Sequence, residues 1–314
     1  MKILVTGATG FVGKNVVERL LKEGHQLTIT SSGAENKLPN ELYDFPNEKG
    51  HKVLYYGLNG IDWSHVYGQD AVIHLAANND TRCLDESEMF LANYHGPVEL
   101  FVKAAIGGCK NFVYASSTAV YGNSPAPYVE GVTEEKPMNV YGRSKLMFDE
   151  FAMKFAEDSD HKVIGLRYCN IYGPGEEHKG KRMSMIGQLL RSVHAGKKPT
   201  LFTDGEQSRD WVYVEDVVDA NMLAISSDES GIYNIGSGVA TSFNELVSRI
   251  ADIVQKQDVL PPNYIDCPFE NEYQSYTCCD IEKAKSHLGY EPKYDLATGL
   301  WSYSEYLVRH RLNV

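Results

Sequence analysis

The hydrophobic positions in the first half of the chain form short apolar runs that alternate with amphipathic stretches. The run at residues 3–5 is followed by Val16, Val17, Leu20 and Leu21 at helical spacing. A short continuous apolar run is typical of a strand buried on both faces, and the spacing that follows is that of an amphipathic helix. The chain therefore begins with a strand, a turn and a helix.

Further apolar runs predict five more strands, and helical patterns lie between them at residues 86–106 and 143–155. The runs are residues 26–31, 52–56, 71–77, 111–116 and 162–169. Strands that alternate with helices indicate a parallel sheet with helices on both faces. The predicted fold class is α/β, a Rossmann-like doubly wound parallel sheet.

The second half of the chain has a less regular pattern, and its loops are marked by Pro261, Pro262 and Pro268. Helical stretches are predicted at residues 181–195, 242–254, 280–288 and 296–308. We expect a smaller, mostly helical C-terminal substrate domain. The predicted boundaries are 1–170 for the domain of the large sheet, with a returning segment near 211–238, and 171–210 with 239–314 for the second domain.

Charge and composition limit the partners of the chain. The 314 residues carry a formal net charge of -12 without a Lys/Arg block, which disfavours nucleic acid and anionic membranes. No apolar run approaches the ~20 residues of a membrane helix. We expect no signal peptide, because the first predicted strand begins at Lys2. The 6 cysteines and 10 histidines show no metal-ligand spacing. We expect a cytoplasmic protein with reduced thiols and no catalytic metal.

Three glycines, Gly7, Gly10 and Gly13, lie directly between the first strand and the first helix. Such glycines let the backbone turn tightly and approach phosphates, while the helix N-terminus favours negative charge. The arrangement predicts the pyrophosphate site of a dinucleotide, and the alternative is a purely structural glycine turn. The residues that end the fourth predicted strand, Leu75, Ala76 and Ala77, are expected to lie against this cofactor.

The end of the second predicted strand favours NADP, with NAD possible. NAD-preferring folds usually carry an acidic residue there that binds the ribose 2′-hydroxyl. This chain has Ser31 and Ser32, with Lys37 shortly after, and these side chains suit a 2′-phosphate. The alternative is that both serines are turn residues. Asn59, beyond the third strand, is a candidate for the adenine edge.

Tyr141 and Lys145 form a Tyr-x-x-x-Lys spacing that places both side chains on one helix face. The lysine charge, together with an oxidised nicotinamide, would lower the tyrosine pKa and make the tyrosine a general base. Ser117 follows the fifth predicted strand and is the candidate to hydrogen-bond the substrate oxygen. The spacing alone is a common accident, but the glycine turn and the strand-end serine give it weight.

These motifs resemble the extended short-chain dehydrogenase/reductases, which act mainly on nucleotide sugars. The resemblance rests on Thr-Gly-x-x-Gly-x-x-Gly, on the trio Ser117, Tyr141 and Lys145, and on residues 167–174, and it covers nearly the whole chain. Within that family, residues 136–150, 175–180 and 208–214, Tyr273-Gln274 and Gly289-Tyr290 resemble the ADP-glyceromanno-heptose 6-epimerases. The loop His178-Lys179-Gly180 is the most telling of these stretches.

The resemblance implies roles for individual residues. Lys179 would be a second acid/base on the face opposite Tyr141, although its sequence context alone favours a solvated loop lysine. Asn93 would support the cofactor site. Phe11, Val12, Lys37 and Ile171 would line the cofactor. The implied substrate positions are Asn170, His178, Lys181, Gln188, Phe202, Arg209 and Tyr273, and the fork of Arg209 suits diphosphate oxygens.

Two positions depart from the heptose epimerases and leave the sugar open. Lys181 and Gln188 stand where the family usually has a serine and a histidine.

The favoured hypothesis is a nucleotide-sugar epimerase that transfers a hydride transiently to tightly held NAD(P), most similar to the heptose 6-epimerases. The alternative is a UDP-hexose 4-epimerase or another epimerase or reductase of the family. A third class, the redox-sensing regulators of this fold, is disfavoured, because those proteins commonly lose the tyrosine or lysine and this chain has both. The partner would be a nucleotide-diphosphate sugar, and the commonest assemblies suggest a homo-oligomer, a dimer or higher.

Overall fold

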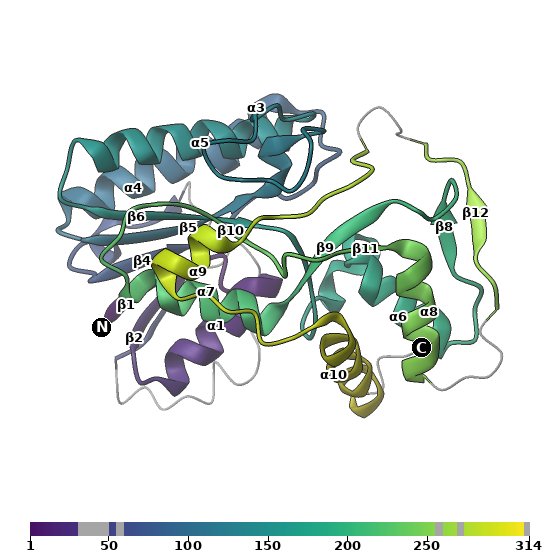
Figure 1. Ribbon diagram of the computed structural model, residues 1–314. Coiled ribbons are helices and arrows are strands. Elements are labelled where there is room, and N and C mark those ends of the chain that lie inside the picture. Colours follow the sequence, from purple (N-terminus) through teal and green to yellow (C-terminus); the bar gives the residue numbers. More distant parts are fainter. Residues whose placement is uncertain (31–49, 55–59, 255–259, 269–272, 311–314) are drawn as a thin grey trace.

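The computed structural model describes residues 1–30, 50–54, 60–254, 260–268 and 273–310. A seven-stranded sheet forms the larger lobe, with the order β10-β6-β5-β4-β1-β2-β3 and parallel pairing throughout (Figure 1). Its strands are β1 (Lys2–Thr6), β2 (Gln26–Thr30), β3 (Lys52–Leu54), β4 (Ala71–His74), β5 (Asn111–Ser117), β6 (Lys162–Tyr168) and β10 (Gly231–Ile235).

Helices cover both faces of this sheet, as Figure 1 shows. The helices are α1 (Phe11–Lys22), α7 (Val214–Ser226) and α9 (Glu282–Leu288) on one face, and α4 (Gly96–Ile106) and α5 (Val140–Glu157) on the other. Side chains that alternate along β1 belong to different cores: Val5 packs in one core with α1 and α7, whereas Leu4 packs in the other with α4 and α5. The prediction of a doubly wound parallel sheet is confirmed.

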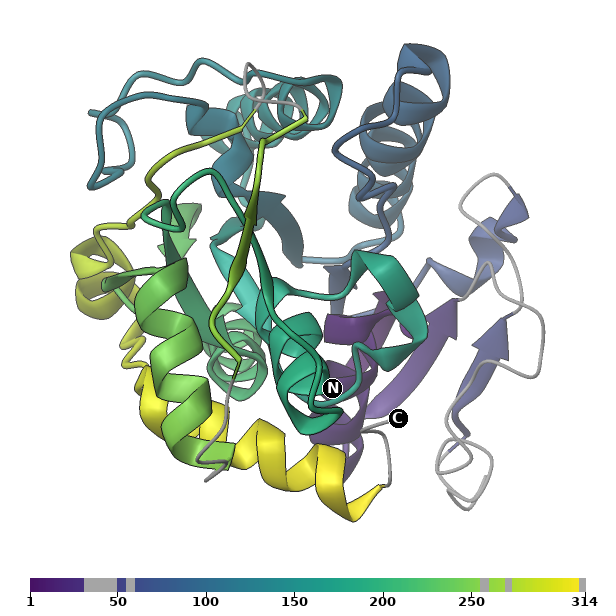
Figure 2. The same cartoon turned by 90° about the vertical axis from the view of Figure 1, so that its right-hand side faces the viewer.

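The smaller lobe is built mainly from helices, and Figure 2 shows it from the side. Its core joins Ile186, Leu246 and Tyr303 from three helices. The elements are α6 (Met185–His194), α8 (Phe243–Val254), α10 (Leu296–Arg309), β7 (Asn170–Tyr172), β8 (Thr200–Phe202), β9 (Ser208–Tyr213), β11 (Ala240–Ser242) and β12 (Asn263–Ile265). The strands form a sheet in the order β11-β9-β7 and a pair, β12-β8. Among the described helices, none has the length and apolar character needed to span a membrane.

Strand β9 contributes to the cores of both lobes. Val212 packs in the core beneath the large sheet, whereas Trp211 and Tyr213 pack in the core of the smaller lobe. Successive side chains of a strand point to opposite faces, which lets one strand serve two cores. The chain then continues directly into α7, which covers the large sheet.

Several boundaries differ from those predicted. The helix expected at residues 86–106 is divided into α3 (Glu86–Phe90), a π-helical turn η5 (Leu91–His95) and α4. The strand expected to reach residue 77 ends at His74, because the Ala76 N–H donates to the Thr6 side chain (3.2 Å) rather than to a neighbouring strand. The short strands of the smaller lobe were not predicted. Further 3₁₀ turns are η4 (Trp63–His65), η6 (Thr118–Tyr121) and η7 (Glu177–Arg182).

The starts of two helices also differ, and side-chain caps explain both. Helix α5 begins at Val140 rather than residue 143, since Asn139 caps it by accepting from the Gly142 N–H at 2.8 Å. Helix α6 begins at Met185 rather than residue 181, because Ser184 is its N-cap. The preceding η7 is interrupted at Gly180, whose φ of 56° is left-handed.

Candidate active site

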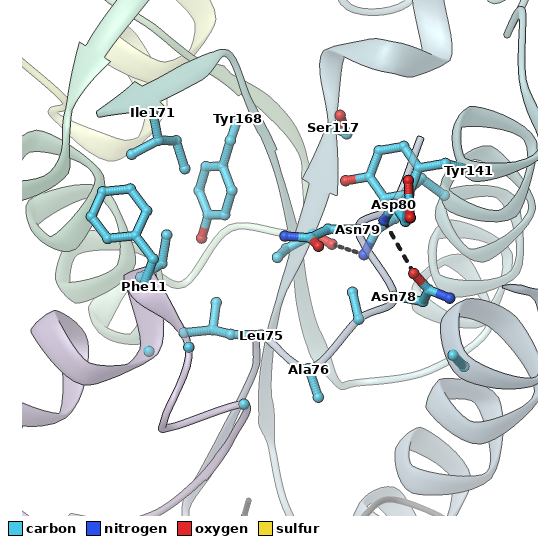
Figure 3. A pocket seen from close by; sticks show the side chains of 18 of the residues that line it. Phe11, Leu75, Ala76, Asn78, Asn79, Asp80, Ser117, Tyr141, Tyr168 and Ile171 are labelled. Atoms are coloured by element: carbon cyan, nitrogen blue, oxygen red, sulfur yellow. Dashed lines mark hydrogen bonds between the residues drawn. The ribbon is translucent and has the colours of Figure 1, made fainter. Parts of the chain in front are cut away.

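A cavity of about 810 Å³ lies at the carboxyl ends of the large-sheet strands (Figure 3). The strand order reverses between β1 and β4, the place where open α/β sheets bind ligands. The predicted site residues that line this cavity are Gly7, Gly10, Phe11, Val12, Gly13, Leu75, Ala76, Ala77, Ser117, Tyr141, Lys145, Ile171 and Lys179. One cavity thus brings together most of the predicted cofactor and catalytic positions.

Sequence reasoning missed other residues in the cavity wall. Asn78, Asn79 and Asp80 follow Ala77 directly, and Tyr168 ends β6. A signal existed for all four, because they lie at the carboxyl ends of predicted strands, as the recognised residues do. Arg182 carried no such signal, since it lies in a loop of the smaller lobe.

Some predicted positions lie outside the described residues. They are Ser31, Ser32, Lys37 and Asn59, which had been assigned to the cofactor. The side chain of Lys181 is also outside the described part of the structure.

The glycine turn has the geometry that a dinucleotide diphosphate needs. Gly7 has a φ of 69°, and a Cβ there would lie 2.6 Å from the backbone nitrogen of Ala76. A Cβ at Gly13 would lie 2.1 Å from the Gly7 carbonyl oxygen. Helix α1 has no side-chain cap at Gly10 and no acidic residue in its first turn. Its first N–H groups have no intrahelical acceptor and suit an anion, so the residues fit the predicted cofactor.

Helix α5 and strand β5 bring the predicted catalytic trio to the cavity, and Figure 3 shows Ser117 and Tyr141 on the same side of it. The Lys145 Nζ lies 5.9 Å from the centre of the Tyr141 ring and donates to the Ala115 carbonyl at 2.9 Å. Ser117 ends β5, and its Oγ accepts from the Ala119 N–H at 3.2 Å. The phenol, the hydroxyl and the ammonium are therefore fixed near one another by a helix and a strand.

Burial dominates the proton affinities of these groups. It raises the pKa of Tyr141, while the Ser117 hydroxyl lowers it. Burial also lowers the pKa of Lys145 to about 8, against the attraction of Asp149, which raises it. In the protein alone the pKa of Tyr141 is therefore raised, because burial disfavours the phenolate, whereas the lysine charge was expected to lower it.

Asp149 anchors helix α5 one turn beyond Lys145. Its Oδ2 accepts from the Ser116 hydroxyl (2.9 Å) and from the Arg167 guanidinium (2.9 Å). Arg167 is 1% exposed and also pairs with Glu135 at 2.5 Å. This ion network ties α5 to β5 and β6 behind the site.

Asn93 lies behind the cavity wall rather than in it. This side chain is 2% exposed and belongs to the π-helical turn η5. Its Oδ1 accepts from the Asn78 N–H (2.8 Å), and its Nδ2 donates to the Asn78 carbonyl (2.9 Å) and to the Ser144 hydroxyl (3.1 Å). The Ser144 hydroxyl in turn donates to the Tyr141 carbonyl at 2.7 Å. Asn93 therefore connects the loop after β4 to the catalytic helix.

Lys179 reaches the cavity from the smaller lobe. Its Nζ lies 4.8 Å from the centre of the Phe11 ring. Figure 3 shows Phe11 and Tyr141 on opposite sides of the cavity, so Lys179 and Tyr141 border it from opposite walls. Burial lowers the pKa of Lys179, the Glu176 carboxylate raises it and Arg182 lowers it. An amine and a phenol thus face one cavity from two directions.

Two predicted substrate residues near this loop lie outside the cavity lining that the described residues form. His178 is exposed, with its Nδ1 3.1 Å from the Gly175 carbonyl oxygen. Gln188 is exposed on α6, and its Nε2 donates to the Met183 carbonyl at 2.8 Å.

The remaining predicted substrate residues lie in the smaller lobe, also outside that lining. The guanidinium carbon of Arg209 lies 4.8 Å from the Tyr273 ring centre and 5.7 Å from that of Phe243. The Phe202 and Tyr273 rings meet edge to face, with centres 5.7 Å apart. Asn170 donates from its Nδ2 to the Asp210 carbonyl at 3.3 Å. Arg209 is thus held between aromatic rings.

One group of potential metal ligands occurs among the described residues: Cys169, Asp210 and Cys279. The Asp210 carboxylate already accepts hydrogen bonds from the Ser237 N–H and hydroxyl, the Gly238 N–H and the Cys279 N–H, at 2.7 to 3.1 Å. Burial raises the pKa of both thiols, which keeps them protonated. These features are those of a structural anchor rather than a metal centre.

Comparisons with known proteins agree with this geometry. The model of the NAD dependent epimerase/dehydratase family matches residues 3–236. The solved structure of ADP-L-glycero-D-manno-heptose-6-epimerase from Helicobacter pylori is 35% identical, covers 98% of this chain and 96% of its own, and has a TM-score of 0.86.

Two other solved structures are similar over their whole length. UDP-glucose 4-epimerase from Thermotoga maritima, with UDP-glucose, is 28% identical over 99% of this chain and 100% of its own, with a TM-score of 0.86. MoeE5, in complex with UDP-glucuronic acid and NAD, is 29% identical over the same shares, with a TM-score of 0.86. Related proteins with different sugars therefore share this fold.

Proposed function

The chain belongs to the NAD dependent epimerase/dehydratase family, and on that premise we propose that it is a nucleotide-sugar epimerase that inverts C6 of an ADP-heptose. The observation that carries the proposal is the placement of Lys179 and Tyr141 on opposite walls of one cavity. Inversion presents the same oxygen from two faces in turn, so a proton carrier is useful on each side. The 35% identity to a heptose 6-epimerase supports the same reaction.

Each catalytic side chain has a defined task in this proposal. Tyr141 takes the proton from the sugar hydroxyl, while the Ser117 hydroxyl hydrogen-bonds the same oxygen. The Lys145 ammonium stabilises the Tyr141 phenolate. Lys179 gives a proton to the oxygen when it is presented toward the opposite wall. A nicotinamide dinucleotide bound along the glycine turn supplies the hydride acceptor and donor.

The substrate diphosphate is assigned to the smaller lobe. Arg209 is 7% exposed, and its guanidinium lies against the rings of Tyr273 and Phe243, which orient it before any ligand binds. A planar guanidinium matches the oxygens of a diphosphate. With Arg209 holding the diphosphate, the sugar would extend toward the catalytic cavity.

For the cofactor we propose NADP, with NAD as the alternative. The support for NADP is the sequence after β2, where Ser31, Ser32 and Lys37 replace the acidic residue of NAD-preferring folds. The MoeE5 structure contains NAD, which supports the alternative. Heating the purified protein and identifying the released nucleotide by mass spectrometry distinguishes the two.

A UDP-hexose 4-epimerase is the second candidate. Lys181 and Gln188 depart from the heptose epimerases at positions that face the sugar in those enzymes. The similarity to UDP-glucose 4-epimerase from Thermotoga maritima supports this alternative. Such an enzyme relies on Tyr141 and has no need of a second proton carrier at Lys179.

NMR of the purified protein with ADP-D-glycero-D-manno-heptose, without added cofactor, tests the proposal. Inversion at C6 is expected, with no net reduced nicotinamide formed during turnover. An unchanged heptose spectrum together with turnover of a UDP-hexose at C4 would replace the proposal with the second candidate.

A further inference from the structure

The loop that carries Lys179 is closed by a single buried carboxylate. Glu176 is 0% exposed and directly precedes η7, the turn that contains Lys179. Its Oε2 accepts from the Ser184 N–H, and its Oε1 accepts from the Ser184 hydroxyl, both at 2.6 Å. Ser184 lies at the other end of the loop and caps α6. One side chain thus links the two ends of the segment.

The same residue also contacts the backbone of Lys179. The Glu176 carbonyl accepts from the Lys179 N–H at 2.9 Å. Further along, the Met183 N–H donates to the Gly180 carbonyl at 3.2 Å. The loop is therefore fixed by its own backbone as well as by the Glu176 side chain, which restricts where the Lys179 amine can lie.

The fold makes room for this carboxylate. A Cβ at Gly187 on α6 would lie 2.7 Å from the Glu176 Oε1 and 3.1 Å from the Tyr303 hydroxyl. The Gly187 N–H donates to the Ser184 hydroxyl at 3.0 Å. A larger residue at position 187 would displace the carboxylate, so Glu176 occupies a site that α6 and α10 leave open for it.

We propose that Glu176 is a positioning residue for Lys179, whose buried carboxylate pins the loop and attracts the charged amine. This inference rests on the proposed role of Lys179 as a proton carrier. It adds an electrostatic partner to that role, since Lys179 lines the cavity and Glu176 lies three residues before it in the chain.

The charges around Lys179 support this pairing. Glu176 raises the pKa of Lys179, whereas burial and Arg182 lower it. Burial lowers the pKa of the neighbouring His178, and the charge of Lys179 lowers it further. Burial raises the pKa of Glu176 itself, while its bonds from Ser184 and the charge of Lys179 lower it. Both carboxylate oxygens accept hydrogen bonds, as an ionised carboxylate does.

Competitive acetylation of the purified protein, read by mass spectrometry across pH, tests the electrostatic part without any substrate. Exposed Lys154 is the internal reference. Glu176→Gln keeps the shape and removes the charge, so labelling of Lys179 near neutral pH is expected to rise roughly threefold or more. Glu177→Gln changes the adjacent, more exposed carboxylate and is the matched control, with unchanged labelling expected.

The titration separates charge from accessibility. The midpoint of the labelling curve reports the proton affinity of Lys179, and its limiting rate at high pH reports access to the reagent. An equal midpoint in the wild type and Glu176→Gln would overturn the electrostatic role. A lower midpoint in Glu176→Gln, with no change in Glu177→Gln, supports the electrostatic role. That result would stand even if the protein failed to turn over ADP-heptose, which would contradict only the proposed function.

Pinning of the loop is tested with a second variant that does not depend on Glu176→Gln folding. Ser184→Ala removes the hydroxyl that binds Glu176. Trypsin cleaves after Lys179, Lys181 and Arg182, so cleavage in this loop is expected to be severalfold faster in Ser184→Ala than in the wild type. Equal cleavage rates would contradict the proposed pinning.

Discussion

Asn93 and Asn78 exchange two hydrogen bonds, of 2.8 and 2.9 Å, between one side chain and one peptide backbone. The pair joins a π-helical turn to the loop that lines the cavity after β4. π-helical turns frequently occur at functional sites, and here the turn carries the amide that holds the loop after β4. The cavity wall therefore depends on a residue that does not face the cavity.

Replacement of Asn93 tests this dependence. Asn93→Ala leaves the Asn78 backbone groups and the Ser144 hydroxyl without this partner, so the free energy of unfolding is expected to fall by about 2–3 kcal/mol. Urea denaturation measures the change. Asn123→Ala, at an exposed position, is the control and is expected to remain within about 0.5 kcal/mol of the wild type. Equal stability of the two variants would contradict a supporting role for Asn93.

We expect the pKa of Lys145 to set an alkaline limit on activity. Burial lowers this pKa to about 8, so the ammonium loses its charge as the pH rises past that value. The Tyr141 phenolate then loses its cationic neighbour, and kcat/KM is expected to fall on the alkaline side. Arginine stays protonated at these pH values, so Lys145→Arg should lower the maximum rate but remove this alkaline decline. A decline in Lys145→Arg at the same pH would assign the limit to another group.

Lys179→Met distinguishes the two candidate functions. Methionine keeps an unbranched side chain but carries no proton, so a 6-epimerase with a second proton carrier is expected to lose about 100-fold or more in kcat. A 4-epimerase that relies on Tyr141 should retain much of its rate. Lys198→Met, at an exposed lysine of the smaller lobe, controls for the loss of positive charge.

Arg209 is expected to contribute to binding rather than to chemistry. Arg209→Lys keeps the charge but loses the planar fork that lies between Tyr273 and Phe243. The substrate KM should rise about tenfold, which corresponds to about 1.4 kcal/mol of binding free energy, with little change in kcat. Steady-state kinetics with the accepted sugar nucleotide measure both constants. Arg249→Lys on the exposed side of α8 is the control, and a loss confined to kcat would move Arg209 into the catalytic step.

The sequence predicted six of the seven strands of the large sheet, together with α1, α4 and α5, because these elements have strong periodic patterns. Strand β10 and helix α7 were not predicted. The short strands of the smaller lobe escaped prediction, since β7, β9 and β11 are held by partners distant in the chain. The π-helical turn at residues 91–95 also escaped, because one widened turn barely changes a helical pattern. Only tertiary contacts determine such features.

The candidate site shows the same division. The glycines occur at the spacing that a phosphate-binding turn requires, and Tyr141 and Lys145 occur at the spacing that places two side chains on one helix face. These residues were therefore found from the sequence. Glu176 and Glu177 are adjacent and chemically identical, yet only Glu176 is fully buried. No pattern in the residues separates these two acids, because the difference comes from the space that Gly187 leaves on another helix.

Strand β9 has a consequence for how the molecule melts. Val212 packs with the large lobe while Trp211 and Tyr213 pack with the smaller one, so neither core can come apart while β9 stays intact. We therefore expect one calorimetric transition, with equal van't Hoff and calorimetric enthalpies, rather than two. The predicted cofactor-binding lobe and the predicted sugar-binding lobe would then unfold at the same temperature. An intermediate in which only one lobe is folded would not accumulate.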